Sequence, residues 1–185
     1  MVKLLGCSIM EREMDYLIKK SRLDVDIKYL DCALHAFPEQ LCAEIESCLE
    51  YMGNTVLIYG NKCCAHIEKV AAEHGAVLIG AGNCIEMILG PDITGQERYK
   101  RAFFLTAGWF AKWYLMVKKT LKWDRNSARL NFGYCDRMLF VDTGLIEISD
   151  REIQDISDYT GLPVEKYKTD LVYFENLLLN ALKNY

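Results

Sequence analysis

The sequence predicts an α/β fold with a largely parallel sheet, crossover helices and a Rossmann-like three-layer architecture. Apolar, strand-like runs alternate with amphipathic stretches along most of the 185 residues. This order is typical of parallel strands joined by helices. Hydrophobic residues make up 51% of the chain and charged residues 26%, enough for one good core. We therefore expect a single α/β domain over residues 1–185, although a second small subdomain would also fit this length.

The first half of the chain contains four strand-like runs with amphipathic stretches between them. The expected strands cover residues 2–7, 25–31, 55–60 and 76–80. The expected helices cover residues 11–21, 37–54 and 65–75. Pro38 suits the first turn of the second of these helices, and Gly75 suits the end of the third. These runs predict the parallel core of the sheet.

The second half continues the alternation with a more aromatic composition. Two further strands are expected at residues 102–106 and 138–144, with a loop at 91–100 and a third candidate strand at 162–167. A long aromatic helix is expected at 108–123, and other helices at 151–161 and 171–184. Ser149 and Glu152 have the spacing of a capping box, which predicts the start of the helix at 151–161.

Charge and standard motifs exclude several classes of protein. The net charge of -4 is not gathered into blocks, so neither nucleic acid nor an anionic membrane surface is an expected partner. No run approaches the roughly 18 apolar residues of a membrane span, and a cytoplasmic location is expected. Gly80 and Gly82 lack the third glycine of a dinucleotide fingerprint. The chain also contains no Walker A loop, C-x-x-C pair or G-x-S-x-G elbow.

Cysteines stand where several expected strands end. Cys7 ends the first strand, Cys63 and Cys64 follow the third, and Cys84 follows the fourth. The carboxyl ends of parallel strands meet at one edge of a sheet, which is where ligands bind in open α/β folds. Helix N-termini also favour thiolate over thiol. In a cytoplasmic chain of this size we expect all eight cysteines to be reduced, so the strand-end thiols are candidate metal ligands or nucleophiles.

Packing is the competing interpretation for each thiol, because cysteine often behaves as a small buried hydrophobe. Cys48 shares an apolar helical stripe with Leu41, Ile45 and Met52, which favours core packing. Cys32 and Cys42 have no comparable site argument, and Cys135 stays ambiguous.

Other side chains near the expected strand ends could contribute to a site. Asp31 and His35 could form a carboxylate–imidazole pair that orients a base or supplies a ligand, or His35 could be satisfied by backbone. His66 is a weaker candidate. Tyr59 is a candidate cofactor contact. Tyr59 and Gly60 could also shape the turn before Cys63, with Gly60 allowing close backbone approach.

Two candidates come from the second half of the chain. Trp109 could cover a ligand pocket, although its spacing with Trp113 and Met116 favours core packing. Asn131 could supply a polar contact to a ligand.

The chain resembles the domain of unknown function 1638 family over nearly its whole length. The resemblance rests on GCSIMERE, YLDCALHAFPEQL, YGNKCC, GNCIEMILG, FFLTAGWF, ARLNFGYCDRMLFVDTGL and YTGLPVEKYKTDLVYFENLL. It implies an anaerobic setting, in methanogens and anaerobic bacteria, beside corrinoid proteins and methylamine-type methyltransferases. The family's cysteine pattern falls on Cys7, Cys63 and Cys84, whereas Cys64 and Cys135 depart from it.

Three converging thiolates suit a metal centre. Zinc could take Cys7, Cys63 and Cys84, with His35 or an exchangeable ligand as the fourth. An iron–sulfur cluster could use the same cysteines and leave one iron open, and the anaerobic setting tilts the choice slightly toward it. The D-x-H-x-x-G pattern of corrinoid carriers is absent.

We therefore expect a metal-binding protein of anaerobic, corrinoid-linked one-carbon metabolism that acts in methyl or electron transfer. The alternative is a noncatalytic partner that docks on a methyltransferase or corrinoid protein, with structural cysteines. The sequence is compatible with either role and with any oligomeric state.

Overall fold

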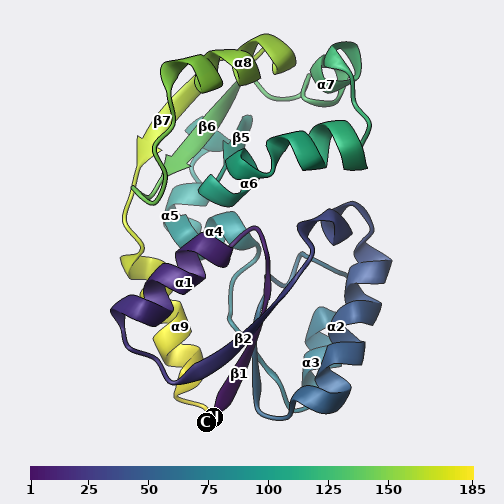
Figure 1. Ribbon diagram of the computed structural model, residues 1–185, viewed down its shortest axis with the longest axis vertical. Helices are drawn as coiled ribbons and strands as arrows, with labels where there is room; N and C mark the ends of the chain where they lie inside the picture. The colour runs from purple at the N-terminus through teal and green to yellow at the C-terminus, as the bar shows by residue number, and fades with distance from the viewer. The chain divides into compact units, whose positions relative to one another are not determined.

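The chain forms two compact units, each built on its own parallel sheet (Figure 1). The computed structural model describes all residues, 1–185. One unit comprises Met1–Gly90 and Leu171–Tyr185, and the other Pro91–Asp170. Both sheets contain parallel pairs only, so the predicted α/β class with parallel strands is confirmed. The expectation of a single domain over 1–185 stays a prediction.

The first unit has a four-stranded sheet in the order β2-β1-β3-β4. Its strands are β1 (Val2–Cys7), β2 (Val25–Leu30), β3 (Thr55–Ile58) and β4 (Val77–Leu78). The last four residues of β1 and all of β3 are buried, because strands covered on both faces read as continuous apolar runs. All four strands match the predicted positions.

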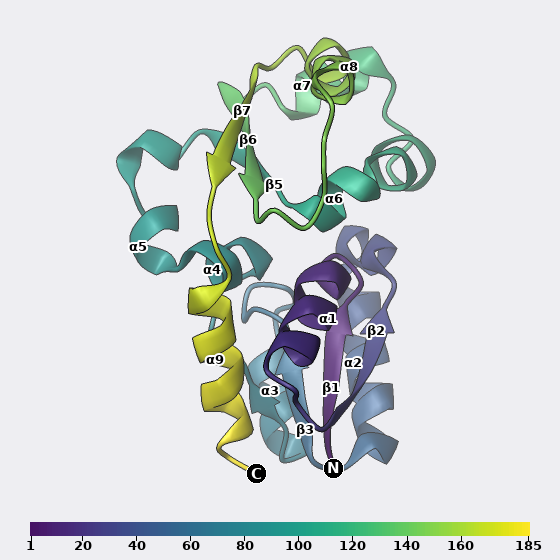
Figure 2. The same cartoon turned by 60° about the vertical axis from the view of Figure 1, so that its left-hand side comes forward.

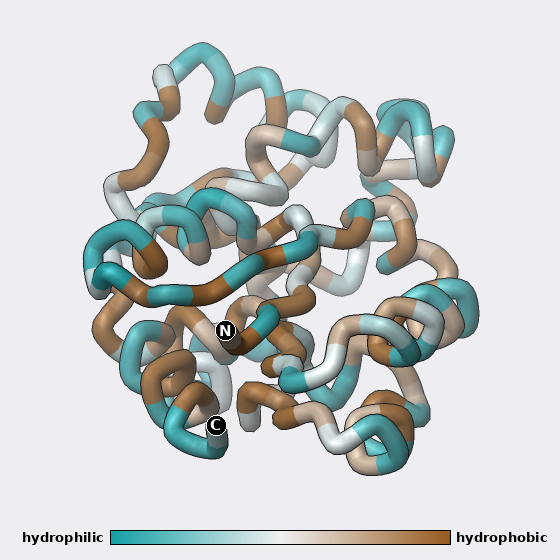
Figure 3. Tube along the Cα trace, turned by 60° about the horizontal axis from the view of Figure 1, so that its bottom comes forward, coloured by the Kyte–Doolittle hydropathy of each residue, from teal (hydrophilic) through white to brown (hydrophobic).

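Helices cover both faces of this sheet, which gives the Rossmann-like three-layer arrangement. They are α1 (Glu11–Lys20), α2 (Pro38–Met52), α3 (Ile67–Glu73), α4 (Cys84–Leu89) and α9 (Val172–Leu182), with a 3-10 helix, η1, at Cys32–Ala36. Figures 1 and 2 show α1 and α9 on one side of the sheet and α2 and α3 on the other. Teal and brown segments alternate along the outer helices in Figure 3, as expected where one helix face packs on the sheet.

The strand order places a topological switch point between β1 and β3. From β1 the chain crosses to β2 on one side, and from β2 it returns past β1 to β3. In open α/β sheets a crevice forms outside the carboxyl ends of the two strands where the order reverses. The ends of β1 and β3 therefore mark the expected ligand position.

The second unit has three strands in the order β5-β6-β7. These are β5 (Ala102–Leu105), β6 (Arg137–Asp142) and β7 (Val164–Lys168), so the candidate strand at 162–167 is confirmed. The helices are α5 (Pro91–Thr94), α6 (Ala107–Ala111), α7 (Arg125–Asn131) and α8 (Asp150–Thr160). Its core includes Leu105, Trp113, Val117, Ala128, Phe132, Met138 and Ile156.

Three expectations for this second unit are wrong in detail. The long helix at 108–123 is interrupted: α6 ends at Ala111, and a π-helical segment covers Tyr114–Thr120. The apolar periodicity of this segment predicted one regular helix. Its buried side chains Trp113 and Val117 do pack in the core cluster, but the backbone that carries them is not one continuous α-helix. The expected loop at 91–100 contains α5 and a 3-10 turn at Glu97–Tyr99. Helix α7 was not predicted; the Asp124 side chain caps it by accepting from the Ser127 N–H.

The predicted helix signals are confirmed. Ser149 and Glu152 form a reciprocal capping box on α8, and Pro38 occupies the first turn of α2. Gly75 follows His74, the C-cap of α3, with φ +62°, a left-handed conformation that suits glycine after a helix. None of the helices combines the length and apolar composition that a membrane crossing requires.

Candidate functional site

The strand-end cysteines lie at the carboxyl edge of the first unit's sheet. Cys7 is the last residue of β1, and Cys63 lies in the turn after β3, the strand next to β1. Cys84 is the first residue of α4, after β4. The Asn83 side chain fixes that helix start by accepting from the Ile85 and Glu86 N–H groups at 3.0 Å. Cys7 and Cys63 thus flank the switch point.

The Cys7 sulfur lies beside the imidazole of His35, the predicted fourth ligand. Cys7 Sγ is 3.6 Å from Nδ1 of His35, a side chain carried by η1 after β2. The Ile9 N–H donates to the same sulfur at 3.4 Å. Asp31 instead caps η1 by accepting from the Ala33 N–H at 2.9 Å, while His35 faces Cys7. His35 is therefore placed to act beside the Cys7 thiol.

The two turns that carry Cys63 and Cys84 are held together by backbone hydrogen bonds. The Asn61 N–H donates to the Ala81 carbonyl at 2.9 Å, and the Lys62 N–H donates to the Gly82 carbonyl at 3.0 Å. A Cβ added to Gly60 would lie 2.2 Å from that Gly82 oxygen. The expected close approach at Gly60 is confirmed, because only a residue without a side chain lets these turns meet.

Burial keeps the site thiols protonated. Desolvation raises the pKa of Cys7 far above its ordinary value, and the negative charges of Cys84, Cys32 and Cys63 add to the effect. Desolvation raises the pKa of Cys84 to about 12, with further contributions from Cys63 and then Glu13. Burial also raises the pKa of Cys63.

The expectation that helix starts would favour thiolate is therefore wrong in the absence of a cation, because desolvation outweighs the backbone N–H groups. A metal cation reverses this balance, since a coordinating thiol is deprotonated outright. The charges of Cys63 and Cys84 both act on Cys7, and the charge of Cys63 also acts on Cys84.

The imidazole of His35 is shifted in the direction that suits a metal ligand. Desolvation lowers its pKa, so the neutral ring is favoured, although the backbone carbonyl of Cys32 opposes the shift. Neutral imidazole is the form that binds metal ions.

Sequence reasoning missed two side chains at this edge. Glu13, on α1, is 0% exposed, and neither carboxylate oxygen has a hydrogen-bond partner. Cys32, also 0% exposed, begins η1 and acts electrostatically on Cys7. The signal for Glu13 was its position four residues before the buried Leu17, on the inward face of an amphipathic helix.

Tyr59, an expected cofactor contact, is buried directly before this edge. The side chain is 1% exposed, and its hydroxyl has no hydrogen-bond partner. Desolvation raises its pKa, with smaller contributions from Cys7 and Cys63.

Trp109 and Asn131 belong to the second unit. The Trp109 ring packs edge-on against Phe103, with 6.2 Å between centroids, at the margin of that unit's core. The Asn131 side chain is exposed and donates to the Ser127 carbonyl within α7 at 2.8 Å. These contacts explain both residues structurally, and their ligand-binding role stays a prediction.

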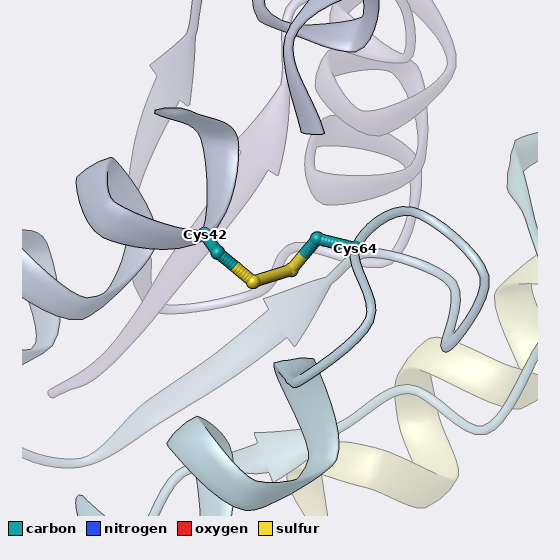
Figure 4. Close-up of a disulfide and its surroundings, with 2 residues drawn as sticks. All are labelled: Cys42 and Cys64. Carbon is teal, nitrogen blue, oxygen red and sulfur yellow. A yellow bond between two sulfur atoms is a disulfide. The ribbon is translucent and has the colours of Figure 1, made fainter. Parts of the chain in front are cut away.

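Cys64 and Cys42 form a disulfide, which corrects the expectation that all eight cysteines are reduced (Figure 4). Their Cα atoms are 5.9 Å apart, because α2 packs beside the turn after β3. A sulfur in this bond is not a thiolate ligand, so Cys64 does not join Cys63 in the site. Cys42 also lines a surface pocket of about 300 Å³ with Pro38, Glu39, Ala65 and His66.

The remaining cysteines are separate from the strand-end site. Cys48 is 0% exposed within the predicted apolar stripe of α2, and its sulfur accepts from Lys28 Nζ at 3.2 Å. The packing prediction for Cys48 is confirmed. Cys135 is half-buried in the second unit.

No group of three or more His, Cys, Asp or Glu side chains is arranged to hold a metal ion in this structure. The donor chemistry nevertheless fits one. Three thiols and an imidazole are the donor types that zinc prefers, and the orphaned Glu13 oxygens supply negative charge beside Cys84.

Comparison with known proteins gives one match. The family model described as "Protein of unknown function (DUF1638)" matches residues 29–178. No curated protein and no solved structure matches the chain. The matched range includes His35, Cys63 and Cys84.

Proposed function

The chain belongs to the DUF1638 family, and we propose that it binds a metal centre through Cys7, Cys63 and Cys84, with His35 as a further ligand. One observation carries this proposal. Cys7 and Cys63 flank the switch point of a parallel sheet, where ligands bind in such folds, and the imidazole of His35 lies 3.6 Å from the Cys7 sulfur.

Electrostatics support a cation at this position. The charges of Cys84, Cys32 and Cys63 raise the pKa of Cys7, and those of Cys63 and Glu13 raise the pKa of Cys84. No Lys or Arg is among the charges that act on these two thiols. A divalent cation would replace the thiol protons and balance the resulting negative charge.

The metal is zinc or an iron–sulfur cluster. Zinc would supply Lewis acidity, and a cluster would supply electron transfer. The setting is the one that the family resemblance implies: methyl or electron transfer in anaerobic, corrinoid-linked one-carbon metabolism, with a corrinoid protein or methyltransferase as partner.

Metal analysis of anaerobically purified protein tests this function. Iron, sulfide, zinc and cobalt are measured for wild type, Cys84→Ala and Cys48→Ala. Cys48 is the control, because it is also a free cysteine but lies on the buried apolar stripe of α2. We expect bound metal in wild type and in the Cys48 variant, and much lower occupancy in Cys84→Ala.

A folded wild-type protein that stays metal-free after anaerobic reconstitution would overturn the proposal. It would favour the noncatalytic alternative, in which the cysteines are structural. Equal occupancy in the Cys84 variant would remove Cys84 from the ligand set.

A further inference from the structure

Glu13 is a buried acid without a partner. Its side chain is 0% exposed, and both carboxylate oxygens are inaccessible and accept no hydrogen bond. Folding gains nothing from such a group, because a buried carboxyl without compensation costs free energy. A buried polar group left unsatisfied requires an explanation, and a missing ion is one of the standard explanations.

The chain itself provides no cation for this carboxyl. Arg12 is the only basic residue whose charge acts on Glu13, and it is its exposed neighbour in sequence. No salt bridge involving Glu13 is formed. A compensating positive charge therefore has to come from outside the chain.

Glu13 lies at the same edge as the strand-end thiols. It occupies the first turn of α1, which starts shortly after Cys7 ends β1. Its charge acts on Cys84, which starts α4. Figures 1 and 2 both show the first turn of α1 and helix α4 at the upper end of this unit, away from the two chain termini.

We propose that the Glu13 carboxylate is an oxygen ligand of the strand-end centre, which it shares with the thiolates of Cys63, Cys84 and Cys7. This inference rests on the proposed function and makes it more specific. Zinc accepts mixed sulfur and carboxylate ligands in a four-coordinate site, whereas iron–sulfur clusters are held by cysteine thiolates. The centre is therefore a single zinc-class divalent ion. In this assignment Glu13 takes the fourth ligand position that the proposed function gives to His35, and His35 becomes a hydrogen-bonding neighbour that orients Cys7.

Ion binding balances without any further reactant. The divalent ion forms three metal–sulfur bonds and one metal–oxygen bond, and each thiol and carboxylic acid that is protonated beforehand releases its proton to solvent. No oxidant or reductant takes part.

Binding of Zn²⁺ and Co²⁺ to chelator-treated protein, kept anaerobic, tests this assignment. The variants are Glu13→Gln, which is isosteric and uncharged, Glu13→Leu, and the control Glu11→Gln, an exposed glutamate on the same helix turn. Affinity is measured by competition with a chromophoric chelator. The Co²⁺ spectrum reports the ligands. The sulfur-to-cobalt charge-transfer band depends on the thiolate ligands, whereas the d–d bands respond to a change in any ligand.

We expect Glu13→Gln and Glu13→Leu to weaken Zn²⁺ binding by about 100-fold or more, beyond the usual effect of losing an outer hydrogen-bond partner. Their d–d bands should shift while the sulfur charge-transfer band remains. Glu11→Gln should match wild type. Circular dichroism of the metal-free variants checks folding, and removal of an uncompensated charge should leave them at least as stable as wild type.

The outcomes separate the two proposals. If wild type binds neither ion nor a cluster, the proposed function fails. If wild type binds Zn²⁺ and both Glu13 variants bind it with equal affinity and an unchanged Co²⁺ spectrum, only the assignment of Glu13 fails. Stoichiometric iron and sulfide in wild type, without zinc binding, would also overturn this inference while leaving the metal site in place.

Discussion

Breaking the Cys42–Cys64 disulfide should lower the free energy of unfolding by about 3 kcal/mol. The bond joins residues with a sequence separation of 22. Closing a loop of this length removes about 11 cal/mol/K of chain entropy from the unfolded state, which is about 3 kcal/mol at room temperature. Cys42 lines an open surface pocket, so a small thiol reductant should reach the bond without global unfolding.

Urea unfolding of the oxidised and reduced protein measures this difference. With a slope of about 2 kcal/mol per molar urea, the midpoint should fall by about 1.5 M on reduction. Far-UV circular dichroism is the appropriate probe, because Trp109, Trp113 and Trp123 all belong to the other unit. The variant Cys42→Ser should reproduce the effect of the reductant.

Two results would refute this reasoning. One is a thiol titration of unreduced, denatured protein that finds all eight cysteines free. The other is a midpoint that does not move on reduction. Cys135→Ser is the matched control, since Cys135 is a free cysteine outside this unit and should leave the difference between oxidised and reduced protein unchanged.

Three further predictions follow from single residues. Gly60→Ala should lower the free energy of unfolding by about 3 kcal/mol or more and abolish metal binding, because its Cβ would lie 2.2 Å from a backbone oxygen. Gly6→Ala is the control, since its Cβ would meet its nearest atom at 3.5 Å. Urea unfolding and metal analysis check this, and equal behaviour of the two variants would contradict it. Ser149→Ala should cost about 1 kcal/mol through loss of the capping box, measured by tryptophan fluorescence during thermal unfolding, and an unshifted transition would argue against the cap. Burial raises the pKa of Glu13 from 4.5 to about 7. The free energy of unfolding of metal-free wild type, relative to that of Glu13→Gln, should therefore be highest below pH 4.5, fall as the pH rises to about 7 and stay level above it. Stability–pH curves of the two proteins that run parallel would disprove the shift.

Local sequence signals were sufficient for most of the fold. The strands of the first unit were predicted from continuous apolar runs, since strands buried on both faces have no polar side to interrupt the pattern. Pro38 in the first turn predicted the start of α2, and the Ser149–Glu152 capping box predicted the start of α8, because both signals depend only on residues within one turn. The π-helical segment at Tyr114–Thr120 was not predictable in this way, because its register follows from packing in the core of the second unit.

Sequence also gave the candidate thiols, but not their surroundings. The positions of Cys7, Cys63 and Cys84 at strand ends follow from counting along the chain, and parallel pairing brings β1 and β3 together. The neighbours of those thiols come from helices packed over the sheet. Glu13 on α1 and the pairing of Cys64 with Cys42 on α2 depend on those packed positions.

The sequence by itself determined the α/β class, the order of the strands along the chain and the set of thiols at their ends. These follow from hydrophobic periodicity and capping, which act over a few residues. Only the tertiary structure decided which thiols are available and how they are charged. Desolvation and disulfide geometry depend on groups brought together from distant positions, as with Cys64, which lies 22 residues from its partner.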